Sequence, residues 1–177
     1  MTQHYICNQK DIQSKLKSLN KTKTSDDGWT IFYADIETQE NWILTQHESE
    51  YHGGGISILK RLPQPTIEEL IDIAITSQDK NNITGASFEL SEREIYNNEN
   101  FRENLISKLL NFDIPNSSEF DKERLKIVIY ESGLYDQTNR RDIVGKHFTE
   151  IEKDADYYQN ISIKAKNILS QIKKYSS

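Results

Sequence analysis

The spacing of apolar residues changes along the chain, and each change indicates a different kind of element. Over residues 8–20, apolar residues recur at helical spacing, which predicts a short amphipathic helix that Asn8 can cap. The polar stretch that follows, KTKTSDDG, is expected to be a loop. Between residues 28 and 61 the pattern gives way to aromatic and β-branched runs, WTIFYADI, WILTQ and ISILKR. Such runs, separated by polar turns, predict three strands.

From Thr66 onward the apolar pattern is helical. Ser117 or Ser118 can cap one of these helices and Gly133 can end it, although LKIVIY inside it also suits a strand. Gly85 and Ala86 are small enough to let another helix approach closely. The apolar stripes fall at residues 67–75, 83–90, 101–112, 125–129, 144–151 and 161–172. These stripes predict a series of helices that ends with two closing helices.

We therefore expect an α+β fold, with a small antiparallel β-sheet formed by about residues 29–61, an N-terminal helix and a C-terminal helical array. The length of 177 residues suits a single domain. Within the span 1–177, the sheet region is expected at 28–62 and the helical region at 66–177. Successive helix pairs suggest a helical-repeat adaptor as an alternative, but no period of about 40 residues recurs three times, as that architecture requires.

Charge and composition narrow the class of partner. The chain has 28 acidic and 22 basic residues, a net charge of −6, which argues against direct binding to nucleic acid, where clustered Lys and Arg are needed. Cys7 is the only cysteine, so no internal disulfide can form. The N-terminus lacks the pattern of a signal peptide, and no apolar run is long enough to span a membrane. We expect a cytoplasmic protein.

The densest group of chemically versatile residues precedes three consecutive glycines. Glycine is used where the backbone takes a positive φ or approaches another group closely, so Gly53, Gly54 and Gly55 predict a constrained loop. That loop either contacts a partner or forms a bulge that leads into the strand ISILK. The residues before it are His47, Glu48, Glu50, Tyr51 and His52.

The same residue types also occur in metal and catalytic sites. The two histidines lie five positions apart in a glycine-bounded loop, which matches no known zinc spacing. Glu50 and His52 could form the acid–base pair of a small hydrolase, yet no nucleophile or oxyanion donor is identifiable beside them. The glycines lead into a strand, whereas a phosphate-binding loop opens a helix. We expect no catalytic residues, no metal and no cofactor.

Other residues have simpler interpretations. Trp29 and Trp42 each begin an apolar strand, which predicts that both anchor the core, with an exposed interface residue as the alternative. Arg140, Arg141 and Asp142 form a mixed-charge patch that we interpret as an ion-pair network between helices. His147 is expected to be a partly buried helix residue.

Residues 28–62 contain an opening strand with a Gly-Trp start, a second Trp and a Ser-Glu-x-His-Gly-Gly-Gly signature. In the order and spacing of these parts, the segment resembles the immunity protein 27 family of bacterial polymorphic-toxin systems. The family usually continues with Trp-Glu-Leu-Thr-Tyr-Pro and places Pro-Pro after the glycines, whereas this chain has WILTQH and IS. The matching residues are Gly28, Trp29, Tyr33, Asp35, Trp42, Ser49, Glu50, His52, Gly53, Gly54 and Gly55.

The resemblance implies that the chain binds a cognate toxin domain and so protects the bacterial cell that makes it. It implies no enzymatic activity and no membrane partner. On this interpretation Glu48, Glu50 and His52 lie near the contact with the toxin, and the glycines set the geometry of their loop. The helical-repeat adaptor and the small hydrolase remain the alternatives.

Overall fold

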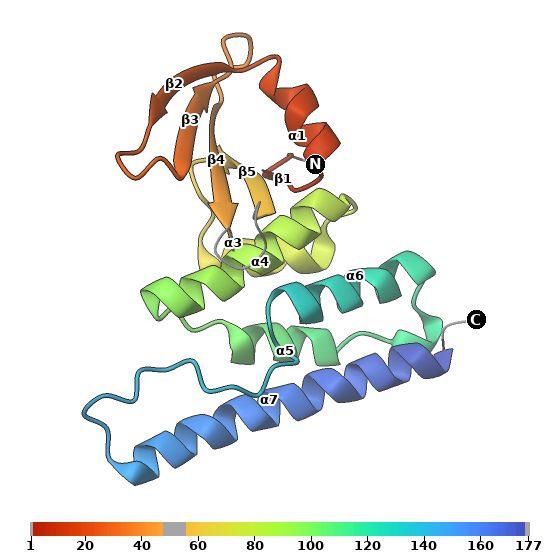
Figure 1. The fold of residues 1–177 in the computed structure, drawn as a ribbon. Coiled ribbons are helices and arrows are strands. Elements are labelled where there is room, and N and C mark those ends of the chain that lie inside the picture. The colour runs from red at the N-terminus through yellow and green to blue at the C-terminus, as the bar shows by residue number, and fades with distance from the viewer. Residues whose placement is uncertain (1, 48–55, 176–177) are drawn as a thin grey trace. The chain divides into compact units, whose positions relative to one another are not determined.

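The computed structural model describes residues 2–47 and 56–175, which form an α+β fold as expected. The chain divides into two compact units (Figure 1). The sheet unit contains residues 1–66 and 77–85, and the helical unit contains residues 67–76 and 86–177. The predicted sheet region therefore lies in the first unit and most of the predicted helical region in the second.

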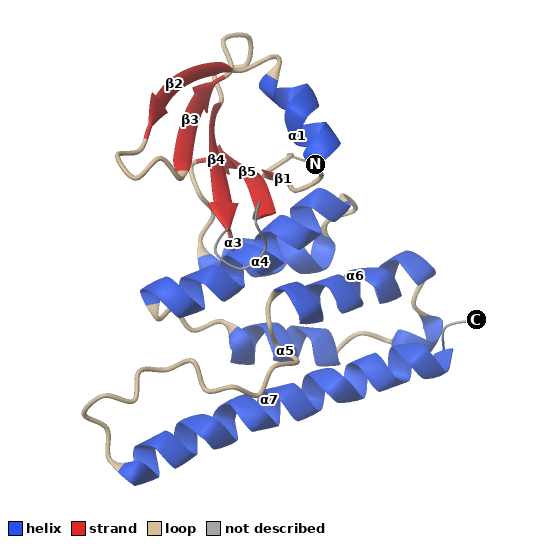
Figure 2. Cartoon of the chain, in the orientation of Figure 1, coloured by secondary structure: helices blue, strands red, loops and turns tan. Residues whose placement is uncertain are grey.

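The sheet unit is built on a five-stranded antiparallel sheet with the strand order β1-β5-β4-β3-β2. Figure 2 draws these strands in red. The three strands predicted from the aromatic and β-branched runs are confirmed as β3, β4 and β5. The strands are β1 (Tyr5–Ile6), β2 (Asn20–Thr24), β3 (Thr30–Ala34), β4 (Asn41–His47) and β5 (Ile56–Leu62).

The first half of the polar stretch KTKTSDDG, residues 21–24, belongs to β2, so the prediction of a loop was wrong there, while residues 25–28 lie in a turn as expected. β2 pairs with β3 at one edge of the sheet, and the register shifts between Lys21 and Lys23. Its side chains are almost all exposed. An edge strand with an exposed face needs no apolar residues, so its sequence carries no alternation to detect.

Helix α1 (Gln9–Leu16) covers the core of the sheet unit. Its N-terminus is capped as predicted, because the Asn8 side chain accepts hydrogen bonds from the backbone N–H groups of Lys10 and Asp11. Trp42 is only 2% exposed, which confirms that it lies in the core. The core cluster consists of Ile6, Ile12, Leu19, Trp42 and Leu59.

The close approach expected at Gly85 comes from a strand. Asn82 and Gly85 lie at the start of α4, in the part that belongs to the sheet unit. The Asn82 side-chain oxygen accepts hydrogen bonds from the backbone N–H groups of His4, at 2.8 Å, and Tyr5, at 3.0 Å. A Cβ on Gly85 would overlap the Tyr5 side chain. The small residue was recognised correctly, but its neighbour is β1 instead of a helix.

The helical unit contains most of the helices expected from the apolar stripes. Figure 1 shows α7 as a long helix that runs beside α5. None of the helices among the described residues combines the length and apolar character needed to cross a membrane. The bounds are α3 (Ile67–Thr76), α4 (Lys80–Asn97), α5 (Arg102–Leu110), a 3-10 turn η1 (Ile114–Asn116), α6 (Glu119–Glu131) and α7 (Phe148–Tyr175).

The ambiguous stretch LKIVIY is helical and lies in α6. The Ser118 hydroxyl accepts a hydrogen bond from the backbone N–H of Asp121, and Gly133 follows the helix with a φ of 70°. A serine N-cap and a left-handed glycine are strong helix boundaries. With Leu125, Val128 and Ile129 fully buried on one face, these boundaries favour the helix over a strand.

Two closing helices were expected, but the structure has one. The stripe at 144–151 does not form a helix until Phe148, and the preceding segment, residues 136–147, is a loop. Gly145 takes a φ of 79°, a left-handed conformation that an α-helix cannot contain. His147 precedes the helix and is exposed, so the prediction of a partly buried helix residue was wrong.

Candidate functional site

The loop with the glycine triplet lies outside the described residues, together with Glu48, Glu50 and His52. The strands on either side of it are described. β4 ends at His47 and β5 begins at Ile56, and these two residues are partners in the register. Thr30 of β3 pairs with Thr45 of β4. The start of β3 therefore lies at the same end of the sheet as the connection from β4 to β5.

Trp29 lies at that end of the sheet and is 48% exposed, so its assignment to the core was wrong. The Asp27 carboxylate accepts hydrogen bonds from the Trp29 backbone N–H, at 3.0 Å, and from the Ser25 hydroxyl, at 2.5 Å. The Ser25 hydrogen bond is the main cause that lowers the pKa of Asp27. Gly28 has a φ of 79°, so this tight turn holds Trp29 outside the apolar core and leaves half of its surface available for contact.

The charged residues around Trp42 serve the fold. The Lys15 ammonium lies 2.9 Å from a carboxylate oxygen of Asp35 and 5.2 Å from the centre of the Trp42 ring. Asp35 also accepts hydrogen bonds from the backbone N–H groups of Glu37 and Thr38. The Lys15 hydrogen bond is the main cause that lowers the pKa of Asp35 to about 2. These contacts tie α1 to the turn between β3 and β4.

The core of the helical unit contains a buried ion pair. Arg102 is fully buried, and its Nε and Nη2 atoms donate to the two carboxylate oxygens of Glu94 at 2.6 and 2.7 Å. Its Nη1 donates to the Gly133 carbonyl at 2.9 Å. The guanidinium carbon lies 4.7 Å from the centre of the Tyr158 ring, and the Tyr158 hydroxyl donates to Glu94 at 3.2 Å.

Burial, followed by the charge of Glu94, raises the pKa of Tyr158 to about 12. The Tyr158 hydroxyl therefore keeps its proton at neutral pH. A general acid or base, in contrast, must lose and regain its proton near the pH at which it works. Every polar atom of the Arg102 side chain that contacts Glu94 or Gly133 points into the core. The arrangement joins helices α4, α5 and α7 through Glu94, Arg102 and Tyr158.

A second ion-pair network fixes the loop 136–147. Arg141 Nη1 lies 2.5 Å and Lys146 Nζ 2.7 Å from the two carboxylate oxygens of Asp154. Arg140 donates to Asp136 and to the Ser91 hydroxyl. The hydrogen bonds from Lys146 and then Arg141 lower the pKa of Asp154. The expected ion pairs of Arg140 and Arg141 are confirmed, but the prediction that the patch links two helices was wrong, because residues 136–147 are a loop and Asp142 accepts the Val144 N–H within it.

Sequence reasoning missed Asp154, the centre of this network. Its signal is its position, because Asp154 falls on the buried stripe of α7 that continues through Tyr158 and Ile161. An acidic residue in an apolar stripe needs a cation to compensate its burial. Arg141, Asp154 and Lys146 are close in the sequence, so their pairing is open to prediction once the buried face of α7 is known.

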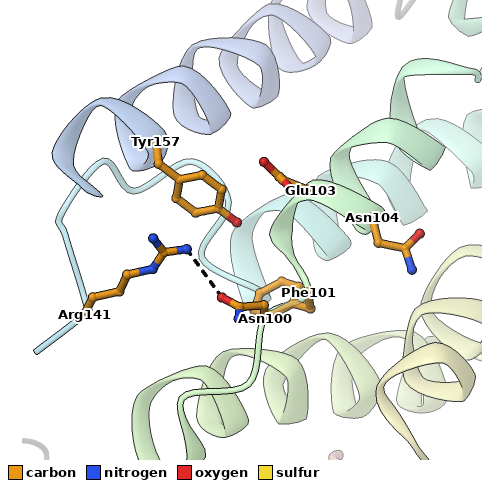
Figure 3. A pocket seen from close by; sticks show the side chains of 6 residues that line it. All are labelled: Asn100, Phe101, Glu103, Asn104, Arg141 and Tyr157. Carbon is orange, nitrogen blue, oxygen red and sulfur yellow. Dashed lines mark hydrogen bonds between the residues drawn. The ribbon is translucent and has the colours of Figure 1, made fainter. Parts of the chain in front are cut away.

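The surface beside this network is hollowed. Figure 3 shows a pocket in which Arg141 Nη2 donates to Asn100 Oδ1 at 3.4 Å and the Tyr157 ring lies beside the Arg141 guanidinium. This pocket has a volume of about 530 Å³, and a second hollow of about 470 Å³ shares Asn100 and Arg141 with it. The lining of the pocket in Figure 3 is Asn100, Phe101, Glu103, Asn104, Arg141 and Tyr157.

These pockets offer polar contacts but not a nucleophile with an adjacent base. Within the described ranges, no three His, Cys, Asp or Glu residues are grouped so that they could hold a metal ion. Comparison of the chain with protein-family models, with curated proteins and with solved structures finds no match.

Proposed function

We propose that this chain is an immunity protein of the bacterial cytoplasm, which binds a cognate toxin domain and neutralises it by occlusion. The proposal rests on one observation, the resemblance of residues 28–62 to the immunity protein 27 family. On this proposal the protein acts stoichiometrically and turns over no substrate.

The arrangement of the described strands supports the proposal. The resembling segment, residues 28–62, spans β3, β4 and β5, which are neighbours in the sheet as well as in the sequence. Trp42 at the start of β4 anchors the core, and Trp29 before β3 is half exposed. The register puts the start of β3, directly after Trp29, at the end of the sheet where β4 ends at His47 and β5 begins at Ile56. Aromatic residues are enriched among those that dominate binding energy.

The distribution of charge supports a basic partner. The helical unit has 19 acidic and 14 basic residues, a net charge of −5, whereas the sheet unit has 9 and 8, a net charge of −1. Two proteins of opposite charge associate faster because they attract each other, and this rate enhancement becomes smaller as salt screens the charges. A basic toxin domain is therefore the partner that this composition favours.

A co-expression experiment tests the proposal. The toxin domain encoded next to this gene should arrest growth when it is produced alone, and the wild-type protein should restore growth. Titration of the purified toxin activity should reach its endpoint near one equivalent, because each molecule occludes one toxin. Failure of the wild-type protein to protect would refute the proposal, and full protection well below one equivalent would indicate an enzyme.

The role of the glycine loop can be tested separately. Reversing the charge of Glu48 and Glu50 to Lys should slow association with a basic toxin and weaken its salt dependence. The matched control is the pair Glu37→Lys and Glu68→Lys, which changes net charge equally at two exposed positions outside the loop. If the loop pair behaves like the control pair, the loop is not part of the contact.

A further inference from the structure

Three large apolar side chains are exposed within six consecutive positions of the helical unit. Val144 is 85% exposed, Phe148 66% and Ile143 56%. Single exposed apolar residues are ordinary on protein surfaces, whereas a local group of them marks a contact site more often. We define residues 142–150, which contain these three side chains, as the tip.

The backbone of the tip is fixed by a tight turn. The Lys146 N–H donates to the Ile143 carbonyl at 3.2 Å, and Gly145 within the turn has a φ of 79°. This geometry places Val144 at the apex of the turn. Because the turn is closed before any partner arrives, less conformational freedom is lost when its side chains are buried on binding.

The tip is also anchored to the body of the helical unit. Lys146 and Arg141 both contact Asp154, which is 8% exposed on α7. Arg141 also stacks over the Tyr157 ring, with its guanidinium carbon 4.5 Å from the ring centre. These contacts hold the loop from both sides of Val144, and they engage the positive charge of Lys146 with a buried carboxylate.

Two carboxylates flank the apolar residues. Asp142 accepts a hydrogen bond from the Val144 N–H at 2.9 Å, and Glu150 accepts one from the His147 N–H at 2.9 Å. Both acidic residues are exposed. With Lys146 paired to Asp154, the tip presents an apolar centre between two negative charges.

We infer that the tip is the contact surface of the helical unit for the toxin, and that it docks into an apolar depression bordered by basic residues on that protein. The inference rests on the proposed function. An apolar depression on the partner would complement the apolar centre of the tip. Basic residues around that depression would complement the charges of Asp142 and Glu150. A tip of this kind would contribute most of its binding energy through Val144 and Phe148.

Binding of the purified toxin domain by the full chain tests the inference. The variant with both Val144→Ala and Phe148→Ala should raise Kd about tenfold or more, mainly through faster dissociation. Its melting temperature should stay at the wild-type value because both side chains are exposed. The matched control is Ile163→Ala, which removes a 49% exposed apolar side chain elsewhere on α7 and should leave Kd unchanged.

A second variant tests the basic border of the partner. The pair Asp142→Asn and Glu150→Gln removes two charges but keeps the acceptor oxygens that hold the turn, so association should slow and lose salt dependence. If the alanine variant binds like wild type while the wild-type protein protects cells, the inference fails and the proposed function stands. If the wild-type protein gives no protection, both fail. An unchanged association rate and salt dependence for the amide pair would refute the basic border.

Discussion

Replacement of Arg102 by Met should destabilise the helical unit strongly. The change removes the two hydrogen bonds to Glu94 and the one to the Gly133 carbonyl. The Glu94 carboxylate then stays buried with the Tyr158 hydroxyl, at 3.2 Å, as a remaining donor. Removing one member of a buried ion pair costs about 3–5 kcal/mol. That loss is a large part of the 5–15 kcal/mol by which domains of this kind are typically stable.

A double variant separates the isolated charge from other effects of the substitution. Arg102→Met combined with Glu94→Leu removes both charges and keeps apolar volume in the core, a replacement that is often close to neutral. The Tyr158 hydroxyl then loses its acceptor, and an unsatisfied buried polar group costs roughly 1–3 kcal/mol. The double variant should therefore be more stable than the single variant. Arg140→Met, which breaks a partly exposed pair with Asp136, should cost about 1 kcal/mol or less.

Urea denaturation followed by circular dichroism at a helix-sensitive wavelength measures these differences. Tryptophan fluorescence cannot replace it, because Trp29 and Trp42 both lie in the sheet unit. The reasoning would be refuted by a single variant that loses less than about 1 kcal/mol, well below the usual cost of breaking a buried pair. It would also be refuted if the double variant were no more stable than the single one.

Further predictions concern the core and its titration. Trp42→Ala should cost about 3–5 kcal/mol in urea denaturation, whereas Trp29→Ala, at a half-exposed position, should change stability little; equal losses would contradict the assigned burial. Gly85→Ala should destabilise by roughly 1–3 kcal/mol, because the added methyl group overlaps Tyr5, and an unchanged unfolding midpoint would contradict that contact. The pKa of Tyr158 is about 12 in the folded protein and about 10 when unfolded. The protonated Tyr158 hydroxyl therefore makes its full contribution to the free energy of unfolding below pH 10, and this contribution is lost as the pH rises toward 12. Between pH 9 and pH 11 the free energy of unfolding of the wild type should fall by roughly 1 kcal/mol more than that of Tyr158→Phe.

The central strands and most helices could be predicted because burial leaves a periodic pattern in the sequence. β3, β4 and β5 combine aromatic and β-branched residues, and α7 repeats its apolar positions from Ile161 to Ile172. β2 could not be predicted in this way, because an exposed edge strand is stabilised by backbone pairing. Its sequence, NKTKT, contains no apolar residue.

The errors at Trp29 and at the stripe 144–151 share a physical cause, which is that an apolar side chain need not be buried. Trp29 and Val144 both sit beside turns whose glycines, Gly28 and Gly145, have positive φ values. In each case the turn directs the apolar residue away from the core, although the local pattern resembles a strand or a helix. The ion pair of Arg102 with Glu94 was also beyond prediction from one sequence, because it depends on helices that meet only in the fold. The roles of Glu48, Glu50 and His52 stay predictions.

The edges of the sheet have a consequence for how this protein behaves when it accumulates. β1 contributes only two residues at one edge, and at the other edge β2 carries Lys21 and Lys23 beside a shift in register. Short, charged and irregular edges disfavour the addition of a strand from another molecule. Both edges of the sheet therefore disfavour strand-by-strand polymerisation between copies of this chain.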